Sequence, residues 1–168
     1  MGGGYGYANG VVVSPWNKLF RKEVIKGVKA SGYLGEDEEM NDYVNSKNCK
    51  VVVIRDEFYY WCQNLASMSN QPFSAKRFHF LDMLKKRCEL FDDEYIVSES
   101  EKLYCNIFIE YYYKAKEREV TVSDRYFLEF RKMHVSLWKR RSCGLKFHLR
   151  MLLFTLSPLL YKKIVNCL

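Results

Sequence analysis

The chain lacks any apolar run of the roughly 18 residues that a helix needs to cross a bilayer. It also lacks the basic segment followed by an apolar one that marks a secretory signal, because residues 1–10 are rich in Gly and Tyr. We therefore expect a cytoplasmic protein that does not span a membrane.

Motifs for a metal, a disulfide framework or a phosphate loop are missing as well. The six cysteines include no C-x-x-C pair, and the three histidines do not follow them at zinc-ligand spacing. Without a secretory start, the thiols are expected to be reduced and mostly buried. The three glycines at 2–4 precede no strand-to-helix unit, so we interpret them as a flexible leader. These absences predict a chain that binds no cofactor by itself.

What the sequence does contain is enough for a packed core. Its 168 residues are 48% hydrophobic and 16% aromatic, and they show no internal repeat or low-complexity linker. The formal net charge of +7 is uneven, because an acidic cluster lies early and Lys and Arg crowd the C-terminal end. This asymmetry predicts a polyanionic surface as the partner.

Residue periodicity predicts an α+β fold that is predominantly α-helical. Short β-branched or aromatic runs favour strands at 11–14, 51–54 and 58–61, with a short helix at 16–23 and another that follows the acidic cluster and ends near Lys47. A polar loop is expected from 63 to 72.

From Ser74 onward, apolar residues recur at three- and four-residue intervals and predict a bundle of amphipathic helices. The expected helices cover 74–91 and 98–116, and a third begins at Ser123; Ser74 and Ser123 are the expected N-caps. Pro158 should divide the tail, 142–168, into two short helices. We expect 1–72 and the helical region 73–168 to pack together as a single compact unit.

Four consecutive carboxylates at 36–39 stand just before the second expected helix. Such crowding costs repulsion unless the anions cap a helix, hold a cation or face a polar substrate. A solvated helix start is the simplest interpretation, and a chemical site is the alternative that the pattern leaves open.

A series of short strings resembles the C-terminal, acceptor-side half of bacterial family-2-type glycosyltransferases with the GT-A fold. The strings are Asn17-Lys18-Leu19-Phe20, Gly35-Glu36-Asp37-Glu38, Asp56-Glu57-Phe58-Tyr59-Tyr60-Trp61, Ser67-Met68-Ser69 and Phe73-Ser74-Ala75-Lys76-Arg77. Their order and spacing match that family from about residue 11 to 116. The resemblance implies transfer of a sugar from a nucleotide-sugar donor to a hydroxyl acceptor, as in polysaccharide biosynthesis at the cell envelope.

In that family the Asp of the Glu-Asp pair serves as the general base, which corresponds to Asp37 here. Glu36 would orient the acceptor or support the base, and Lys18, Glu38 and Tyr60 are the expected substrate contacts. An ion pair with the acidic cluster is the structural alternative for Lys18, and core packing is the alternative for Tyr60. Neighbouring carboxylates raise the pKa of a base whereas a helix N-terminus lowers it, so the sequence leaves the sign of the shift open.

The chain also departs from the family. It has no doubly wound nucleotide-binding half and no D-x-D metal motif, and the pair Asp92-Asp93 is interpreted as solvated surface. Trp61-Cys62-Gln63 stands where the family often has an Arg. A divalent metal (Mg²⁺ or Mn²⁺) and a nucleotide-sugar are thus implied only for a complete parent enzyme, and this chain alone is expected to be inactive.

Basic and apolar residues alternate through the last helices, a pattern typical of amphipathic helices that lie on anionic lipid. The basic residues are Lys132, Lys139, Arg140, Arg141, Lys146, Arg150, Lys162 and Lys163, interleaved with Trp138, Leu145, Phe147, Leu149, Leu152, Leu153, Phe154 and Leu160. We expect a peripheral location at the inner face of the membrane, where a lipid-linked sugar would be the acceptor. A helical bundle with basic polar faces is the alternative.

Two other function classes use the same residues. Nucleic acid is not the expected partner, because no nucleic-acid-binding signature is present and the acidic cluster would repel phosphates. A noncatalytic helical protein that pairs with a second copy or with a separate nucleotide-binding chain is the stronger alternative to the transferase.

Overall fold

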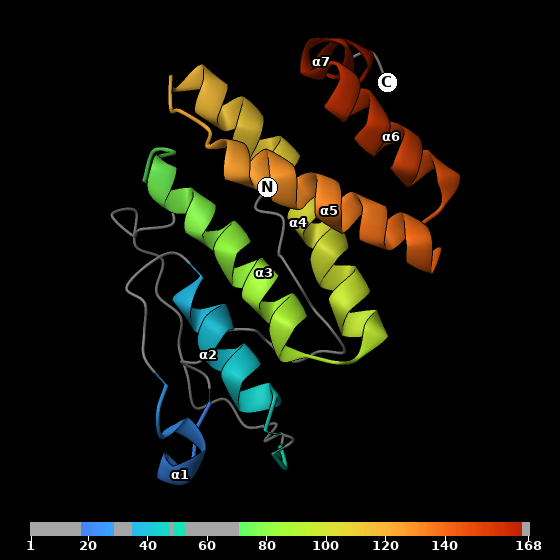
Figure 1. The fold of residues 1–168 in the computed structure, drawn as a ribbon. Helices are drawn as coiled ribbons and strands as arrows, with labels where there is room; N and C mark the ends of the chain where they lie inside the picture. Colours follow the sequence, from blue (N-terminus) through green and yellow to red (C-terminus); the bar gives the residue numbers. More distant parts are fainter. Residues whose placement is uncertain (1–17, 29–34, 48, 53–70, 166–168) are drawn as a thin grey trace. The chain divides into compact units, whose positions relative to one another are not determined.

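The computed structural model describes residues 18–28, 35–47, 49–52 and 71–165 (Figure 1). The chain divides into two compact units, Met1–Pro72 and Phe73–Leu168, and each is considered separately below. Every regular element within the described residues is a helix, so the predominantly α-helical prediction is confirmed there. The described residues give no support to the expected N-terminal strands or to a GT-A-like arrangement.

The first unit contains α1 (Lys22–Ile25) and α2 (Glu36–Asn45). Helix α2 follows Gly35, whose φ of 98° lies in the left-handed region that glycine adopts without strain. Its C-terminal half is tied to the turn after α1, because the Tyr43 hydroxyl donates a hydrogen bond to the Lys26 carbonyl at 3.0 Å. The Lys47 ammonium donates in the same way to the Val24 carbonyl, also at 3.0 Å.

Two expectations for the first unit are wrong where the structure describes them. Val51 and Val52 belong to no strand and are 70% and 84% exposed, so they do not begin a buried strand. A β-branched run forms a strand only where a neighbouring strand pairs with it, which local sequence cannot specify. The expected helix at 16–23 begins only at Lys22 among the described residues. The remaining expected strands, at 11–14 and 58–61, lie outside them.

The second unit holds the other helices, and their order along the chain is the predicted one. They are η3 (Ala75–Phe78), α3 (His79–Leu90), α4 (Glu94–Glu117), α5 (Asp124–Arg140), α6 (Leu145–Leu156) and α7 (Pro158–Val165). Helix α4 begins four residues before the predicted start, because Asp93 accepts a hydrogen bond from the Ile96 amide at 3.0 Å and caps it. Ser74 and Ser123 occupy N-cap positions but make no side-chain cap bond.

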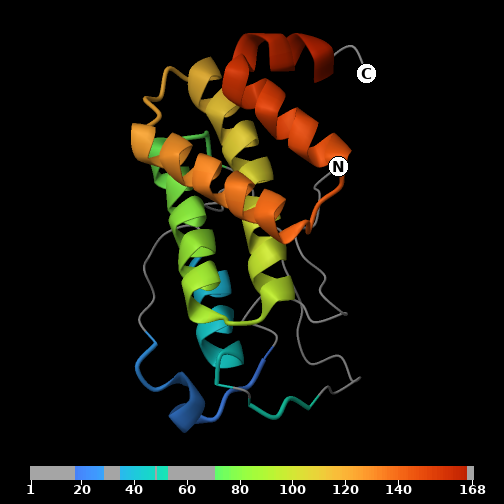
Figure 2. The same ribbon diagram turned by 45° about the vertical axis from the view of Figure 1, so that its right-hand side comes forward.

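Helices α3 and α4 lie side by side, and α5 crosses α4 (Figure 2). The core between them is aromatic. The Phe108 ring of α4 contacts the rings of Phe127 and Phe130 from α5 and of Phe154 from α6, with centroids 4.9, 5.2 and 6.0 Å apart. Phe108, Phe130 and Phe154 are fully buried, so α6 contributes directly to the core of this unit.

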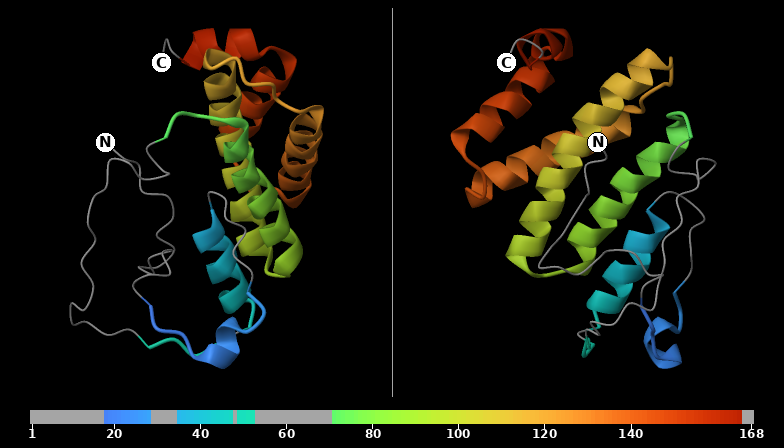
Figure 3. Two further views of the ribbon diagram at one scale, coloured as in Figure 1. Left: turned by 90° about the vertical axis from the view of Figure 1, so that its left-hand side faces the viewer. Right: turned by 180° about the vertical axis from the view of Figure 1, so that it is seen from behind.

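Pro158 separates α6 from α7 as predicted (Figure 3). The proline takes the first helical position, where its missing N–H is no loss. The Ser157 hydroxyl accepts a hydrogen bond from the Leu160 amide at 3.2 Å. Helix α7 is held to α4 because the Tyr113 hydroxyl donates to the Pro158 carbonyl at 2.6 Å and the Tyr113 and Tyr161 rings stack.

Candidate functional site

The carboxylates predicted as a catalytic site share the first turn of α2. Asp37 is partly buried, and this burial, followed by the charges of Glu36 and Glu38, raises the pKa of its carboxyl above 3.8. Asn41, one turn later, donates from Nδ2 to the Asp37 carbonyl at 2.8 Å. The sign of the shift that the sequence left open is thus upward, which is the direction a general base requires.

Of the other predicted substrate contacts, the structure describes only some. Lys18 is partly buried, and burial lowers the pKa of its ammonium. Tyr60 lies outside the described residues. Among those residues, no cluster of three or more His, Cys, Asp and Glu side chains could hold a metal ion. The general-base role of Asp37 therefore stays a prediction, and so does the transferase resemblance.

A different surface dominates the second unit. Leu145, Leu149, Leu152 and Leu156 follow one another along α6 at intervals of four, three and four residues, which places them on one side of the helix. They are 66%, 55%, 42% and 82% exposed. The opposite side of α6, formed by His148, Met151 and Phe154, is buried. A surface helix normally has one apolar side, and α6 has two.

Helix α7 continues this pattern. Leu159, Leu160 and Ile164 are exposed, whereas Tyr161 is buried against Phe154 and Tyr113. We call the exposed residues of both helices the outer apolar face. It consists of Leu145, Leu149, Leu152, Leu156, Leu159, Leu160 and Ile164. A row of aliphatic side chains of this length is uncommon on a protein that has no partner for it.

The charged side chains on α6 and α7 themselves are all positive. Lys146, Arg150, Lys162 and Lys163 are exposed on the same two helices. The sequence contains no Asp or Glu after Glu129. Arg150 donates to the Asn106 side chain and Lys162 lies 3.4 Å from Glu117 Oε1. Lys146 and Lys163 have no ionic partner within the described residues.

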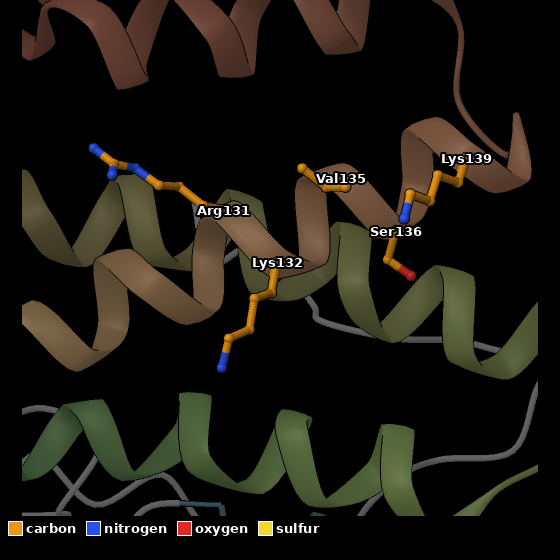
Figure 4. Close-up of a pocket in the computed structure, with 5 residues that line it drawn as sticks. All are labelled: Arg131, Lys132, Val135, Ser136 and Lys139. Carbon is orange, nitrogen blue, oxygen red and sulfur yellow. The ribbon is translucent and has the colours of Figure 1, made fainter.

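A second basic surface lies on α5. Arg131, Lys132, Val135, Ser136 and Lys139 line an open depression of about 400 Å³ (Figure 4). The Arg131 and Lys132 side chains point to opposite sides of the helix, so the cations do not converge on one ligand atom. The Lys132 ammonium also lies 2.8 Å from a Glu129 carboxylate oxygen. This surface supplies diffuse positive charge rather than a formed anion site.

The cysteines that the structure describes form no site. Cys49, Cys88, Cys105 and Cys143 are free thiols, as predicted for the described cysteines, but only Cys105 is fully buried. Cys88 and Cys143 are partly buried against the core and Cys49 is partly exposed, so full burial holds for Cys105 alone among the described cysteines. Their irregular spacing gave no information on which helix side they occupy.

Comparison with known proteins finds no relative of this chain. No family model matches the chain, and neither the curated proteins nor the solved structures give a match. In the described parts of the chain, no helix is long and apolar enough to cross a membrane.

Most of this surface was predicted from the sequence, but its geometry was not. Leu145, Leu149 and Leu152 were grouped with Phe154, which is buried on the opposite side of α6. Leu156 and the apolar residues at 159 and 164 were not predicted. The four-three-four spacing of the leucines was the signal that could have separated the two sides.

Proposed function

We propose that the protein binds anionic membrane surfaces peripherally, with the outer apolar face of α6 and α7 against the lipid. The observation that carries this proposal is that α6 exposes a full leucine row although its other side already fills the core. Water is a poor solvent for such a row, and a lipid interface is a good one. The surrounding Lys and Arg complement anionic headgroups.

The apolar and the electrostatic contributions to the free energy of lipid binding are of similar size. A leucine that is half exposed in the free protein gains on the order of 1 kcal/mol when lipid covers it. Each cation near an anionic surface gains about 1 kcal/mol at moderate salt. Stable peripheral binding generally takes two such signals together, and α6 and α7 carry both. The basic surface on α5 adds to the long-range attraction.

Other partners fit this surface less well. Nonspecific binding of single-stranded nucleic acid uses aromatic side chains on which bases stack, and the outer apolar face is aliphatic throughout. A protein partner of ordinary composition would leave the cations of both helices without complementary charges. The uniform sign of charge favours a continuous anionic surface.

A transferase role remains a second proposal. The raised pKa of Asp37 favours it, because a raised pKa makes the carboxylate a stronger base. Helices that hold an enzyme to lipid would suit an acceptor carried by a lipid-linked sugar. The donor and the metal would have to come from a nucleotide-binding part that we do not find among the described residues.

The test is flotation of the full chain with vesicles of phosphatidylcholine alone or mixed with phosphatidylserine. Leu149→Gln should weaken binding to the mixed vesicles about five- to tenfold, since it removes on the order of 1 kcal/mol of burial. Leu128→Gln is the matched control, because Leu128 on α5 is also 55% exposed but lies outside the outer apolar face.

Charge is tested separately with Lys163→Gln, which should lower binding about fivefold at low salt and flatten the salt dependence. Equal losses in Leu149→Gln and Leu128→Gln would contradict the assignment of the surface. Absence of binding to the mixed vesicles, or equal binding to neutral ones, would refute the proposal.

A further inference from the structure

Two buried histidines meet where α5 packs on α6. His134 and His148 are 7% and 4% exposed. His134 Nε2 and His148 Nδ1 are 3.1 Å apart, and the two rings stack with centroids 5.2 Å apart. At this distance the neutral pair forms one hydrogen bond, in which an N–H of one ring donates to the bare nitrogen of the other.

Aromatic rings close off the rest of the pair. The Trp138 ring lies 4.5 Å from the His148 ring, and Phe147 and Phe130 stand 5.6 and 6.5 Å from His148 and His134 respectively. Together with the helix packing, they leave both imidazoles with little access to water. An added charge is therefore costly at this junction.

No carboxylate in the described helices is positioned to offset that charge. The charged groups of the packed elements have other partners or are exposed. Glu101 bonds Arg140, Glu110 bonds Lys114 and Glu129 bonds Lys132. Lys162 pairs with Glu117, Arg150 bonds Asn106, and the exposed cations are Arg131, Lys139, Lys146 and Lys163. Burial first, and then His148, lowers the pKa of His134.

We propose that protonation of this imidazole pair loosens α6 from α5 and thereby strengthens the binding of α6 and α7 to anionic lipid at acid pH, an inference that rests on the function proposed above. One added proton leaves the central hydrogen bond in place. The second sets two N–H groups against each other 3.1 Å apart, and the two rings then repel as cations.

The direction follows from linkage. A histidine whose pKa is lowered by folding binds fewer protons in the packed state than in the open state. The packed state therefore loses stability as the pH falls below the ordinary histidine value of about 6.5, until the folded pKa is passed. Between these limits, the population in which α6 is open rises about tenfold per pH unit for each such proton.

The opened helix is well suited to lipid. Its inward residues Met151 and Phe154 are apolar, so a loosened α6 presents hydrophobic side chains on its inner as well as its outer side, which lipid accepts and water does not. The imidazolium ions add positive charge toward the anionic headgroups. Both changes act in the same direction.

The experiment follows amide hydrogen exchange of the full chain between about pH 7.5 and pH 5, with protection corrected for intrinsic exchange. Protection in α6 should fall below about pH 6.5, by up to about tenfold per pH unit for each proton bound, whereas that in α3 should not. In His134→Gln and His148→Asn, which keep an amide near the position of the contacting ring nitrogen, the pH dependence of α6 protection should be clearly reduced, because only one buried imidazole remains. His79→Gln, on α3, is the control and should behave like the parent.

Flotation with phosphatidylserine-containing vesicles at the same pH values completes the test. The parent and His79→Gln should bind up to about tenfold more tightly per pH unit toward the acid end, and the gain should be smaller in the two junction variants. Equal pH dependence of α6 protection in the parent and both junction variants overturns the switch. A parent that shows the exchange change but binds no vesicles at any pH overturns the proposed function and supports the histidine junction itself.

Discussion

Replacing Glu101 by Gln should destabilise the second unit more than any surface charge change. Glu101 lies on α4 with its side chain 7% exposed, and it forms an ion pair with Arg140 near the end of α5. Gln keeps the shape of the side chain but removes the charge. The Arg140 guanidinium then lies between two helices without a counter-ion.

The size of the effect follows from how much water reaches the pair. Breaking a fully buried ion pair by removal of one partner costs about 3 to 5 kcal/mol. The Arg140 side chain is 25% exposed, so partial solvation reduces the cost to the lower end, about 3 kcal/mol. For a unit of this size the midpoint of thermal unfolding should fall by about 12 °C or more.

Urea and thermal unfolding followed by circular dichroism measure this change. Glu99→Gln is the control, because Glu99 pairs with Lys102 at 2.5 Å on the surface and its side chain is 48% exposed; it should cost less than about 1 kcal/mol. Adding Arg140→Met to Glu101→Gln should recover stability, since the buried charge is gone. A loss below about 1 kcal/mol for Glu101→Gln, or a double variant less stable than the single one, would refute the reasoning.

Two further predictions concern single groups. The Asp37 carboxyl should titrate above 3.8 when followed by NMR, and Glu36→Gln with Glu38→Gln should shift it only part of the way back, because burial is the larger cause; a full return would contradict this order. Cys105 should resist alkylation in the folded protein, because it is buried and burial raises the pKa of its thiol. Cys49, which is partly exposed, should react. Mass spectrometry of the labelled peptides measures both, and equal labelling would contradict the burial of Cys105.

Helical periodicity predicted most of the helices of the second unit. Apolar residues at three- and four-residue intervals after Ser74 were predicted to share a side, and Phe78, Leu81 and Leu84, which follow this spacing, are all buried. The break at Pro158 was predicted because its ring cannot continue a helix. The start of α4 was misplaced because the cap Asp93 was interpreted only as solvated surface. Asp93 is exposed, but its side chain also caps the N-terminus of α4.

Contacts between distant residues escaped the sequence analysis. Glu101 and Arg140 are 39 residues apart, and His134 and His148 are 14 apart. A sequence pattern shows that such residues fall among apolar neighbours, but it does not show which distant side chain forms their hydrogen bond or ion pair. A weak signal did exist, because Glu101 shares a helix side with Tyr104, Cys105 and Phe108, all buried. The acidic turn at 36–39 was predictable as a cluster, whereas its role was not.

The double-sided character of α6 connects stability with the proposed binding. Phe154 and Met151 hold α6 in the core, while Leu149 and Leu156 on its other side contribute little to folding because they are largely in water. Substitutions on the outer side should therefore change lipid binding without changing the free energy of unfolding, and those on the inner side should change both. The imidazole pair lies on the inner side of the same helix. In the proposed switch, a change of pH at that junction reaches the outer apolar face through one rigid element, with no need for a longer path through the bundle.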